Sequence, residues 1–344
     1  MQTAALTAIE YYLPDQVVTN SQLVAEFPEW TLGKIEQKTG IVERHIAAEQ
    51  ECASDLAVAA AQKLFASGVC QPEEIDYVLL CTQTPDYFLP TSACIVQHRL
   101  GIPTTAGALD FNLGCSGFVY GLGLAKGLIE TNQARQVLLI TAETYSKFIH
   151  PGDKSVRTLF GDAAAATLVQ AVAADASYTD PWLGPFVFGT DGSGAQHLIV
   201  PTGGMRDRHS TDPQKAQIDN FGNTRSPDNL YMNGAEIFTF TLRIVPQTVQ
   251  RLLSQTGKRL EDIDLFVFHQ ANQYVLEHLR QKLNIPPEKF YIALRHTGNT
   301  ISATIPIALK HALAAGRLQP GHQVMLVGFG VGYSWGATLL RWAV

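Results

Sequence analysis

Cysteine is scarce and unevenly placed in this chain of 344 residues. Its five cysteines are an odd number, none of them forms a C-x-x-C pair, and they stand at positions 52, 70, 81, 94 and 115. Such a set predicts neither a disulfide framework nor a zinc site. This cysteine usage is typical of a reducing compartment, and we expect a cytoplasmic protein.

Basic runs and long apolar segments are also missing. No stretch of 18 apolar residues is present, which predicts no membrane-spanning helix. The formal net charge is −6, and no run of five basic residues occurs, which argues against a nucleic-acid partner. The first seven residues contain neither a basic region nor a long apolar segment, so we expect no signal peptide. With 46% hydrophobic residues, the chain has enough apolar side chains for a large core.

Similar segments recur in the same order in the two halves of the sequence. Residues 74–81 resemble residues 262–269, and each segment is an apolar run that follows an acidic turn. Three further pairs follow in chain order, about 170 to 190 residues apart: 100–103 with 283–286, 136–140 with 323–327, and 166–169 with 337–340. This order predicts an internal duplication, with halves at about residues 1–175 and 176–344.

The predicted strands and helices indicate the fold class. The strands are continuous apolar runs, as expected for sheets that helices cover on both faces. One helix is predicted from Ser54 to Ser67, with Ser54 or Asp55 as its N-cap and Gly68 as its stop. A second helix has Pro306 near its start and ends at Gly316. Alternating strands and helices predict a layered α/β fold built from two βαβαβ-type halves.

Cys115 stands at a predicted strand-to-helix turn. It follows the apolar run 106–113, which we expect to be a buried strand, and it precedes a helical pattern over 116–130. Free backbone N–H groups and the helix dipole favour an anion at such a turn, so we expect a lowered thiol pKa and a usable thiolate. Taken alone, an inert buried cysteine is the more common case.

The duplication supplies two partners for this cysteine. It maps Cys115 onto residues 298–303, next to Asn299, and it maps His269 onto Cys81 at the end of the matching strand. If the halves pack about a pseudo-twofold axis, Cys115, His269 and Asn299 converge on one pocket. Taken singly, a histidine at a strand end is more often structural, and an asparagine beside glycine is more often a turn residue.

Several motifs together resemble the β-ketoacyl-ACP synthase III family of the thiolase superfamily, over essentially the whole chain. They are Gly114-Cys115-Ser116-Gly117, Phe160-Gly161-Asp162-Ala163, residues 268–272, residues 298–300, the tail 328–336, and residues 38–45 near the start. The resemblance implies a thiolase-like α-β-α-β-α fold. It also favours Asn299 over its neighbour His296 as the polar partner, because Asn299 matches the motif.

The resemblance implies a reaction in two stages. An acyl group from an acyl-CoA or acyl-ACP moves onto Cys115, and malonyl-ACP then loses carbon dioxide and attacks the acyl-enzyme. His269 and Asn299 would donate hydrogen bonds to the enolate oxygen. The oxyanion formed at Cys115 would be held by its own N–H and by the loop Gly330–Gly332, with Val331 as the expected donor. No cofactor or metal is implied, only the thioester substrates.

The resemblance also implies further contacts. It suggests a homodimer, in which Leu89 lines the acyl pocket of the partner, and an acyl carrier protein as the second partner. The expected substrate-binding residues are Asn272, Phe329, Leu89, Lys154 and Trp30, and the expected carrier-docking residues are Arg280 and Lys282, with Arg295 as a further candidate. The polar segment 203–229 resembles an insertion relative to compact family members, either as a plain surface loop or as a lid of the acyl tunnel.

Related chemistries are separated by the cysteine positions. Thiolases carry a second catalytic cysteine near the C-terminus, whereas Cys115 is the last cysteine of this chain. Elongating synthases use two histidines, and the Asn299 motif differs from theirs. Two alternatives stay open. Plant-type polyketide synthases share the Cys-His-Asn set, although the tail motif favours the synthase III family. An acyltransferase of the same fold would pass the acyl group from Cys115 to an oxygen, a nitrogen or a non-malonyl carbon.

Overall fold

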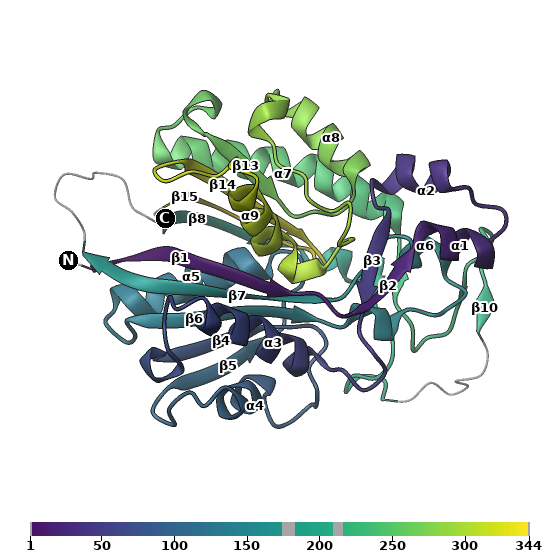
Figure 1. Cartoon of the computed structure of the whole chain (residues 1–344). Helices are drawn as coiled ribbons and strands as arrows, with labels where there is room; N and C mark the ends of the chain where they lie inside the picture. Colours follow the sequence, from purple (N-terminus) through teal and green to yellow (C-terminus); the bar gives the residue numbers. More distant parts are fainter. Residues whose placement is uncertain (1, 174–182, 209–215, 343–344) are drawn as a thin grey trace.

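Two β-sheets organise the molecule. The computed structural model describes residues 2–173, 183–208 and 216–342. The first sheet has the strand order β1-β7-β6-β4-β5, and the second has the order β13-β14-β15-β8 (Figure 1). Their strands are β1 Gln2–Tyr12, β4 Tyr77–Cys81, β5 Gly107–Phe111, β6 Gln136–Glu143, β7 Ala163–Ala173, β8 Leu183–Thr190, β13 Leu265–Phe268, β14 Gln323–Gly330 and β15 Ser334–Arg341.

The two sheets repeat one pairing pattern. β4 runs parallel to β6 as β13 runs parallel to β14, and the pairs that follow, β6–β7–β1 and β14–β15–β8, are antiparallel. The first sheet has one further parallel pair, β4–β5. Even a small detail recurs: the carboxylates of Asp76 and Asp264 accept the backbone N–H groups of Gln136 and Gln323 at 2.9 and 2.8 Å. The predicted duplication is therefore confirmed. The boundary near residue 175 lies outside the described residues and stays a prediction.

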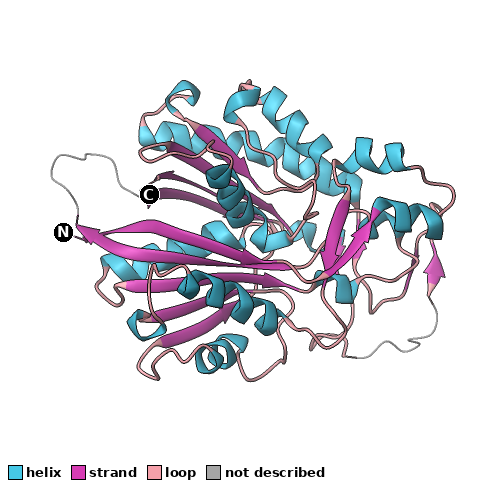
Figure 2. Ribbon diagram, in the orientation of Figure 1, coloured by secondary structure: helices cyan, strands magenta, loops and turns pink. Residues whose placement is uncertain are grey.

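Helices form three layers around and between the sheets (Figure 2). α3 and α4 pack on the first sheet, α5 and α9 lie between the sheets, and α7 packs on the second sheet with α8 against it. This arrangement is the predicted α-β-α-β-α architecture. The bounds are α3 Ala53–Ala66, α4 Ser92–Arg99, α5 Gly117–Glu130, α7 Gly234–Thr256, α8 Gln273–Lys282 and α9 Thr304–Ala314.

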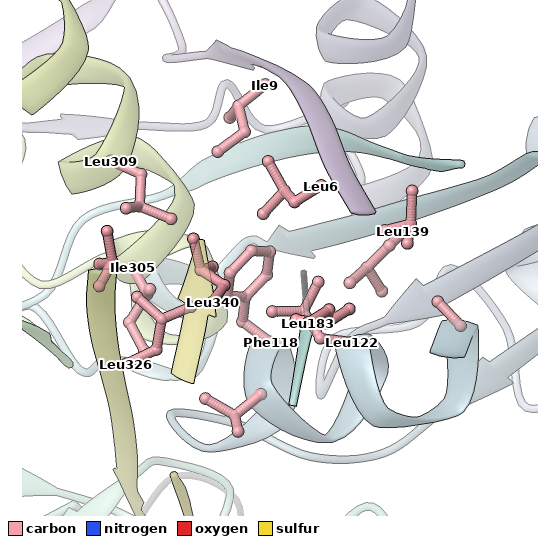
Figure 3. Packing of buried hydrophobic residues seen from close by; sticks show 14 of the residues in the cluster. Leu6, Ile9, Phe118, Leu122, Leu139, Leu183, Ile305, Leu309, Leu326 and Leu340 are labelled. Atoms are coloured by element: carbon pink, nitrogen blue, oxygen red, sulfur yellow. The ribbon is translucent and has the colours of Figure 1, made fainter. Parts of the chain in front are cut away.

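The middle layer is the apolar centre of the molecule. Phe118 and Leu122 of α5 and Ile305 and Leu309 of α9 are completely buried, and Figure 3 shows them among leucines of both sheets. Helix α5 approaches its sheet closely because it begins with glycine. A Cβ added at Gly117 would lie 2.2 Å from the Cys81 sulfur. The same packing therefore fixes the start of α5, directly after Cys115.

Two local predictions need correction. The strand expected to be buried over 106–113 is β5, an edge strand whose residues are only partly buried because it has one neighbour. The helix expected to be capped by Ser54 or Asp55 has Cys52 as its N-cap, and the Asp55 carboxylate accepts the Cys52 backbone N–H at 2.7 Å. The predicted stops hold: Gly68 and Gly316 both adopt positive φ angles, 78° and 67°.

Smaller elements surround this framework at one end of the sheets. They are β2 Gln16–Thr19, α1 Asn20–Glu26, α2 Leu32–Thr39, β3 Glu43–Ile46, α6 Lys154–Arg157, β9 Leu198–Ile199, β10 Gln217–Ile218, β11 Thr224–Arg225 and β12 Tyr231–Met232. The segment 203–229 contains the β10–β11 hairpin, and residues 209–215 of it lie outside the described residues. In the described part of the chain, no helix is both long and apolar enough to cross a membrane.

Candidate active site

Cys115 lies between β5 and α5, where the two halves of the molecule meet. Its side chain is buried, and strand β14 of the second half passes directly against it. A Cβ added at Gly330 would lie 2.8 Å from the Cys115 sulfur, and one at Gly328 would lie 2.8 Å from the Cys115 carbonyl oxygen. Glycine at these two positions therefore allows the second half to reach the cysteine.

The electrostatic environment of Cys115 differs from the one expected from sequence. Backbone N–H groups of Cys115 itself and of Val331 stabilise the thiolate, as expected at this turn. Burial outweighs them, and the nearby Glu143 carboxylate acts in the same direction, so the thiol pKa is raised to about 12. The prediction of a lowered pKa was wrong because the thiol is buried. At neutral pH the resting group is the thiol.

His269 follows β13 and is held on all sides. Its backbone N–H donates to the Val327 carbonyl at 2.8 Å, and its Nδ1 lies 2.8 Å from the Thr304 hydroxyl. The imidazole meets the ring of Phe329 edge-on at 5.5 Å. Burial lowers the pKa of His269 to about 3, so the ring is neutral at physiological pH.

Asn299 is buried in the segment between β13 and α9. Its backbone N–H donates to the Leu159 carbonyl at 2.9 Å, and its side-chain oxygen accepts the Ile301 N–H at 3.0 Å. These two bonds fix the orientation of the amide. Within the described residues the Asn299 Nδ2 has no hydrogen-bond partner, so this NH₂ group can donate to a substrate.

The three predicted residues come to one region of the molecule. Cys115 and Ile301 belong to the same buried cluster, and Asn299 lies two residues before Ile301. On the other side, β14 places Gly330 against Cys115 and Phe329 against the His269 ring. The rival residue His296 lies elsewhere: it is exposed, and its Nδ1 is 2.9 Å from the Glu43 carboxylate.

The predicted substrate-binding residues have other contacts in this structure. Phe329 is buried beside His269, whereas the Asn272 side chain accepts the Val275 N–H at 2.8 Å and caps α8. The Lys154 ammonium is paired with Glu29, and the face of the half-buried Trp30 is covered by the Lys34 ammonium at 4.9 Å. Leu89 is 81% exposed and lies outside the buried cluster around Cys115.

The two predicted docking residues differ from one another. Arg280 is bound to the Glu277 carboxylate at 2.8 Å and to the Ile285 carbonyl at 3.0 Å, so it holds the end of α8. Lys282 is exposed and borders an open groove between α7 and α8, whose other residues include Phe238, Leu242 and Arg243. The third candidate, Arg295, is paired with Glu36.

Sequence reasoning missed a buried polar group beneath the site. Glu143 ends β6 and is completely buried; its carboxylate accepts the Gln83 N–H at 3.0 Å and the Ser302 hydroxyl at 2.7 Å. Burial raises the Glu143 pKa to about 8. A carboxylate at the end of an apolar run was the available signal. In the described ranges, no group of three or more His, Cys, Asp or Glu side chains could hold a metal ion.

Comparison with known proteins identifies the family. The family model described as 3-oxoacyl-[acyl-carrier-protein (ACP)] synthase III matches residues 109–192, and its C-terminal counterpart matches residues 253–342. The chain belongs to this family. A β-ketoacyl-[acyl-carrier-protein] synthase III of Caldanaerobacter subterraneus is 35% identical, and the alignment covers 96% of each chain.

Solved structures agree with this family. The crystal structure of a 3-oxoacyl-(acyl-carrier-protein) synthase III is 55% identical with a TM-score of 0.97, covering 99% of this chain and 100% of that one. A 3-oxoacyl-(acyl-carrier protein) synthase from Burkholderia xenovorans is 36% identical with a TM-score of 0.89, covering 100% and 95%. The thiolase-like architecture of this synthase III chain is thus shared with experimental structures.

Proposed function

We propose that this synthase III uses Cys115 as an acyl carrier and condenses the bound acyl group with malonyl-ACP. Its family membership makes it a condensing acyltransferase. The observation that carries the assignment of residues is the composition of the site. A thiol with two backbone N–H groups lies on one side of the Phe329–Gly330 segment, and a neutral imidazole lies on the other.

The first stage transfers the acyl group. The Cys115 sulfur attacks the thioester carbonyl of an acyl-CoA or acyl-ACP, and a carbon–sulfur bond forms as the departing thiol leaves with the cysteine proton. Negative charge builds on the carbonyl oxygen of the tetrahedral intermediate. The N–H groups of Cys115 and Val331 already face the sulfur, and they are the donors we assign to that oxygen.

The second stage forms the carbon–carbon bond. Malonyl-ACP loses carbon dioxide, and the electron pair passes into an enolate whose oxygen accepts hydrogen bonds from His269 and Asn299. The enolate carbon then attacks the acyl carbonyl and releases the Cys115 thiolate, which takes up a proton. One donor in a dry, preorganised site contributes about 3–4 kcal/mol. Both donors are neutral, so neither is lost by titration at physiological pH.

The partners are an acyl carrier protein and a second copy of the chain, in the cytoplasm. The exposed lysine at 282 is suited to an acidic carrier. Tyr87, Phe88 and Leu89 form an apolar segment with 62, 76 and 81% of their surface exposed, and a homodimer would cover it. The reaction draws on two thioester substrates and needs no cofactor or metal.

The alternative, transfer of the acyl group to an oxygen or nitrogen nucleophile, is not favoured. The relatives that match the chain over almost its whole length are β-ketoacyl-[acyl-carrier-protein] synthases III, which supports the condensing reaction. His269 is a poor base at neutral pH because its pKa is about 3. As a hydrogen-bond donor, however, a neutral imidazole suits an enolate.

Intact-protein mass spectrometry tests the proposal. The protein is mixed with a panel of acyl-CoAs and acyl-ACPs, and malonyl-ACP is added afterwards. We expect an acyl adduct on Cys115 that is discharged into a ketoacyl product. An adduct that persists with malonyl-ACP but passes to another nucleophile would favour the alternative, and the absence of any adduct would exclude Cys115 as the nucleophile.

A further inference from the structure

The Thr304 hydroxyl is the side-chain partner that the structure records for the His269 ring. Thr304 begins α9 and is buried, and its Oγ1 lies 2.8 Å from the His269 Nδ1. A neutral imidazole carries one N–H, on either Nδ1 or Nε2. The hydrogen bond at Nδ1 therefore decides whether Nε2, the nitrogen left for the substrate, is a donor or an acceptor.

The same hydroxyl has a second neighbour. Thr304 Oγ1 also lies 3.0 Å from the Ile301 carbonyl oxygen, and its single hydrogen can point to only one of the two. If it points to Nδ1, the ring proton must be on Nε2. If it points to the Ile301 carbonyl, Nδ1 must carry the proton and donate it to Thr304. The two arrangements give opposite tautomers of His269.

The turn that carries these groups is strained. Ile301 has a φ of 54°, in the left-handed region that β-branched residues rarely adopt. Its carbonyl also favours the protonated imidazole, in the direction that raises the His269 pKa, so it is the acceptor available to a ring N–H in the opposite tautomer. Such strain persists only where the surroundings enforce it, and it is concentrated at functional sites.

We infer that Thr304 is a positioning residue of the condensation step: its hydroxyl donates to the His269 Nδ1 and keeps the imidazole proton on Nε2. The inference rests on the proposed function, because a donor at Nε2 matters only for a developing enolate oxygen. In the opposite tautomer a nitrogen lone pair would face that oxygen and repel it. The low pKa of His269 makes the tautomer, and not protonation, the variable.

Replacing Thr304 with valine separates the two stages. Thr304→Val keeps the shape of the side chain and removes the hydroxyl, so Nδ1 turns its proton to the Ile301 carbonyl and the Nε2 donor is lost. We expect carbon dioxide release from malonyl-ACP to fall about 100-fold, as for loss of one donor in such a site. Acyl loading of Cys115, which does not use His269 as a donor, is expected to persist.

Two matched variants complete the design. Thr304→Ser keeps the hydroxyl, and we expect it to restore decarboxylation to nearly the original rate. Thr167→Val makes the same substitution at a buried strand position whose Oγ1 has no hydrogen-bond partner among the described residues, and we expect both stages to be unchanged. Equal losses of loading and decarboxylation in Thr304→Val, or failure of serine to rescue, would overturn the inference.

The tautomer can also be observed directly in the unmodified protein. Nitrogen-15 NMR of the protein labelled at histidine distinguishes protonated from unprotonated ring nitrogens, and the His269 signals are those missing from His269→Asn. We expect protonated Nε2 in the original protein and protonated Nδ1 in Thr304→Val. Protonated Nδ1 in the original protein would overturn the inference. Failure of the original protein to decarboxylate malonyl-ACP would instead overturn the proposed function.

Discussion

The two halves of the molecule share one architecture but differ beside their equivalent central strands. In the first half, β4 lies between the parallel strands β5 and β6. In the second half, β13 is an edge strand of the described sheet. On the side where β5 would pair, the described residues form an isolated bridge between Phe266 and Phe290. The chain that follows this bridge is largely irregular until α9 begins at Thr304.

This difference explains how the roles are divided. Regular strand and helix in the first half place the sulfur of Cys115 in a position set by close packing of α5. In the second half, the largely irregular chain before α9 forms the loop that carries Asn299 and the turn at Ile301. At the equivalent strand ends, Cys81 donates to the Leu113 carbonyl at 2.9 Å as a structural thiol, whereas His269 faces the site. The two halves thus share one framework, and the second half carries His269 and Asn299, the two donors that we propose.

The largest expected effect comes from removing the group that only the first half provides. For Cys115→Ala we expect no acyl adduct and a fall in condensation of about 10³-fold or more. Carbon dioxide release from malonyl-ACP should persist, because its donors belong to the second half. Mass spectrometry and a decarboxylation assay measure the two stages separately. Cys94→Ser, which changes an exposed thiol, serves as the control and should alter neither stage.

Substitution in the second half should give the opposite pattern. For His269→Ala and Asn299→Ala we expect decarboxylation and condensation to fall about 10²- to 10³-fold, because each removes one enolate donor. Loading of Cys115 should continue. His296→Ala is the matched control, since this exposed histidine is paired with Glu43. Loss of loading in the second-half variants would show that the halves do not act as separately as we propose.

The comparison of the halves also shows what the sequence could reveal. Continuous apolar strands carry a strong signal because each one must be buried, so the duplication and the meeting of Cys115 with the His269 and Asn299 segments could be predicted. The raised pKa of Cys115 could not be predicted from the sequence, because the burial that causes it depends on packing against β14, which is distant in the chain. Thr304 looks in sequence like any helix-starting threonine, and its role depends on a neighbour 35 residues away.

The Glu143 carboxylate of the first half accepts a hydrogen bond from the Ser302 hydroxyl of the second half. Its raised pKa predicts that the stability of the fold depends on pH. Its pKa rises from an ordinary 4.5 to about 8 in the folded state because it is buried. The folded state therefore holds more protons between these values, so this contribution to stability is complete below pH 4.5 and is lost as the pH rises through about 8. Between these pH values the contribution of Glu143 to the free energy of unfolding falls by up to about 1.4 kcal/mol per pH unit. In thermal unfolding from pH 5 to 8, the melting temperature should fall less steeply with pH for Glu143→Gln than for the exposed control Glu261→Gln. Equal slopes would contradict this assignment.

The smallest expected effect comes from Lys282, an exposed residue at the end of α8 in the second half. For Lys282→Glu we expect the KM for malonyl-ACP to rise several-fold with kcat unchanged, because an exposed charge guides association more than it contributes to affinity. Loading from acyl-CoA, which needs no carrier, should be unchanged.

Two further charge reversals serve as controls. Arg280→Glu should act differently, because Arg280 is bound to Glu277 and to the Ile285 carbonyl: we expect it to lower the melting temperature. Arg259→Glu applies the same charge change at an arginine that is 76% exposed. If it raised the KM as much as Lys282→Glu does, the effect would reflect net charge, and the carrier would have no specific site at the groove between α7 and α8.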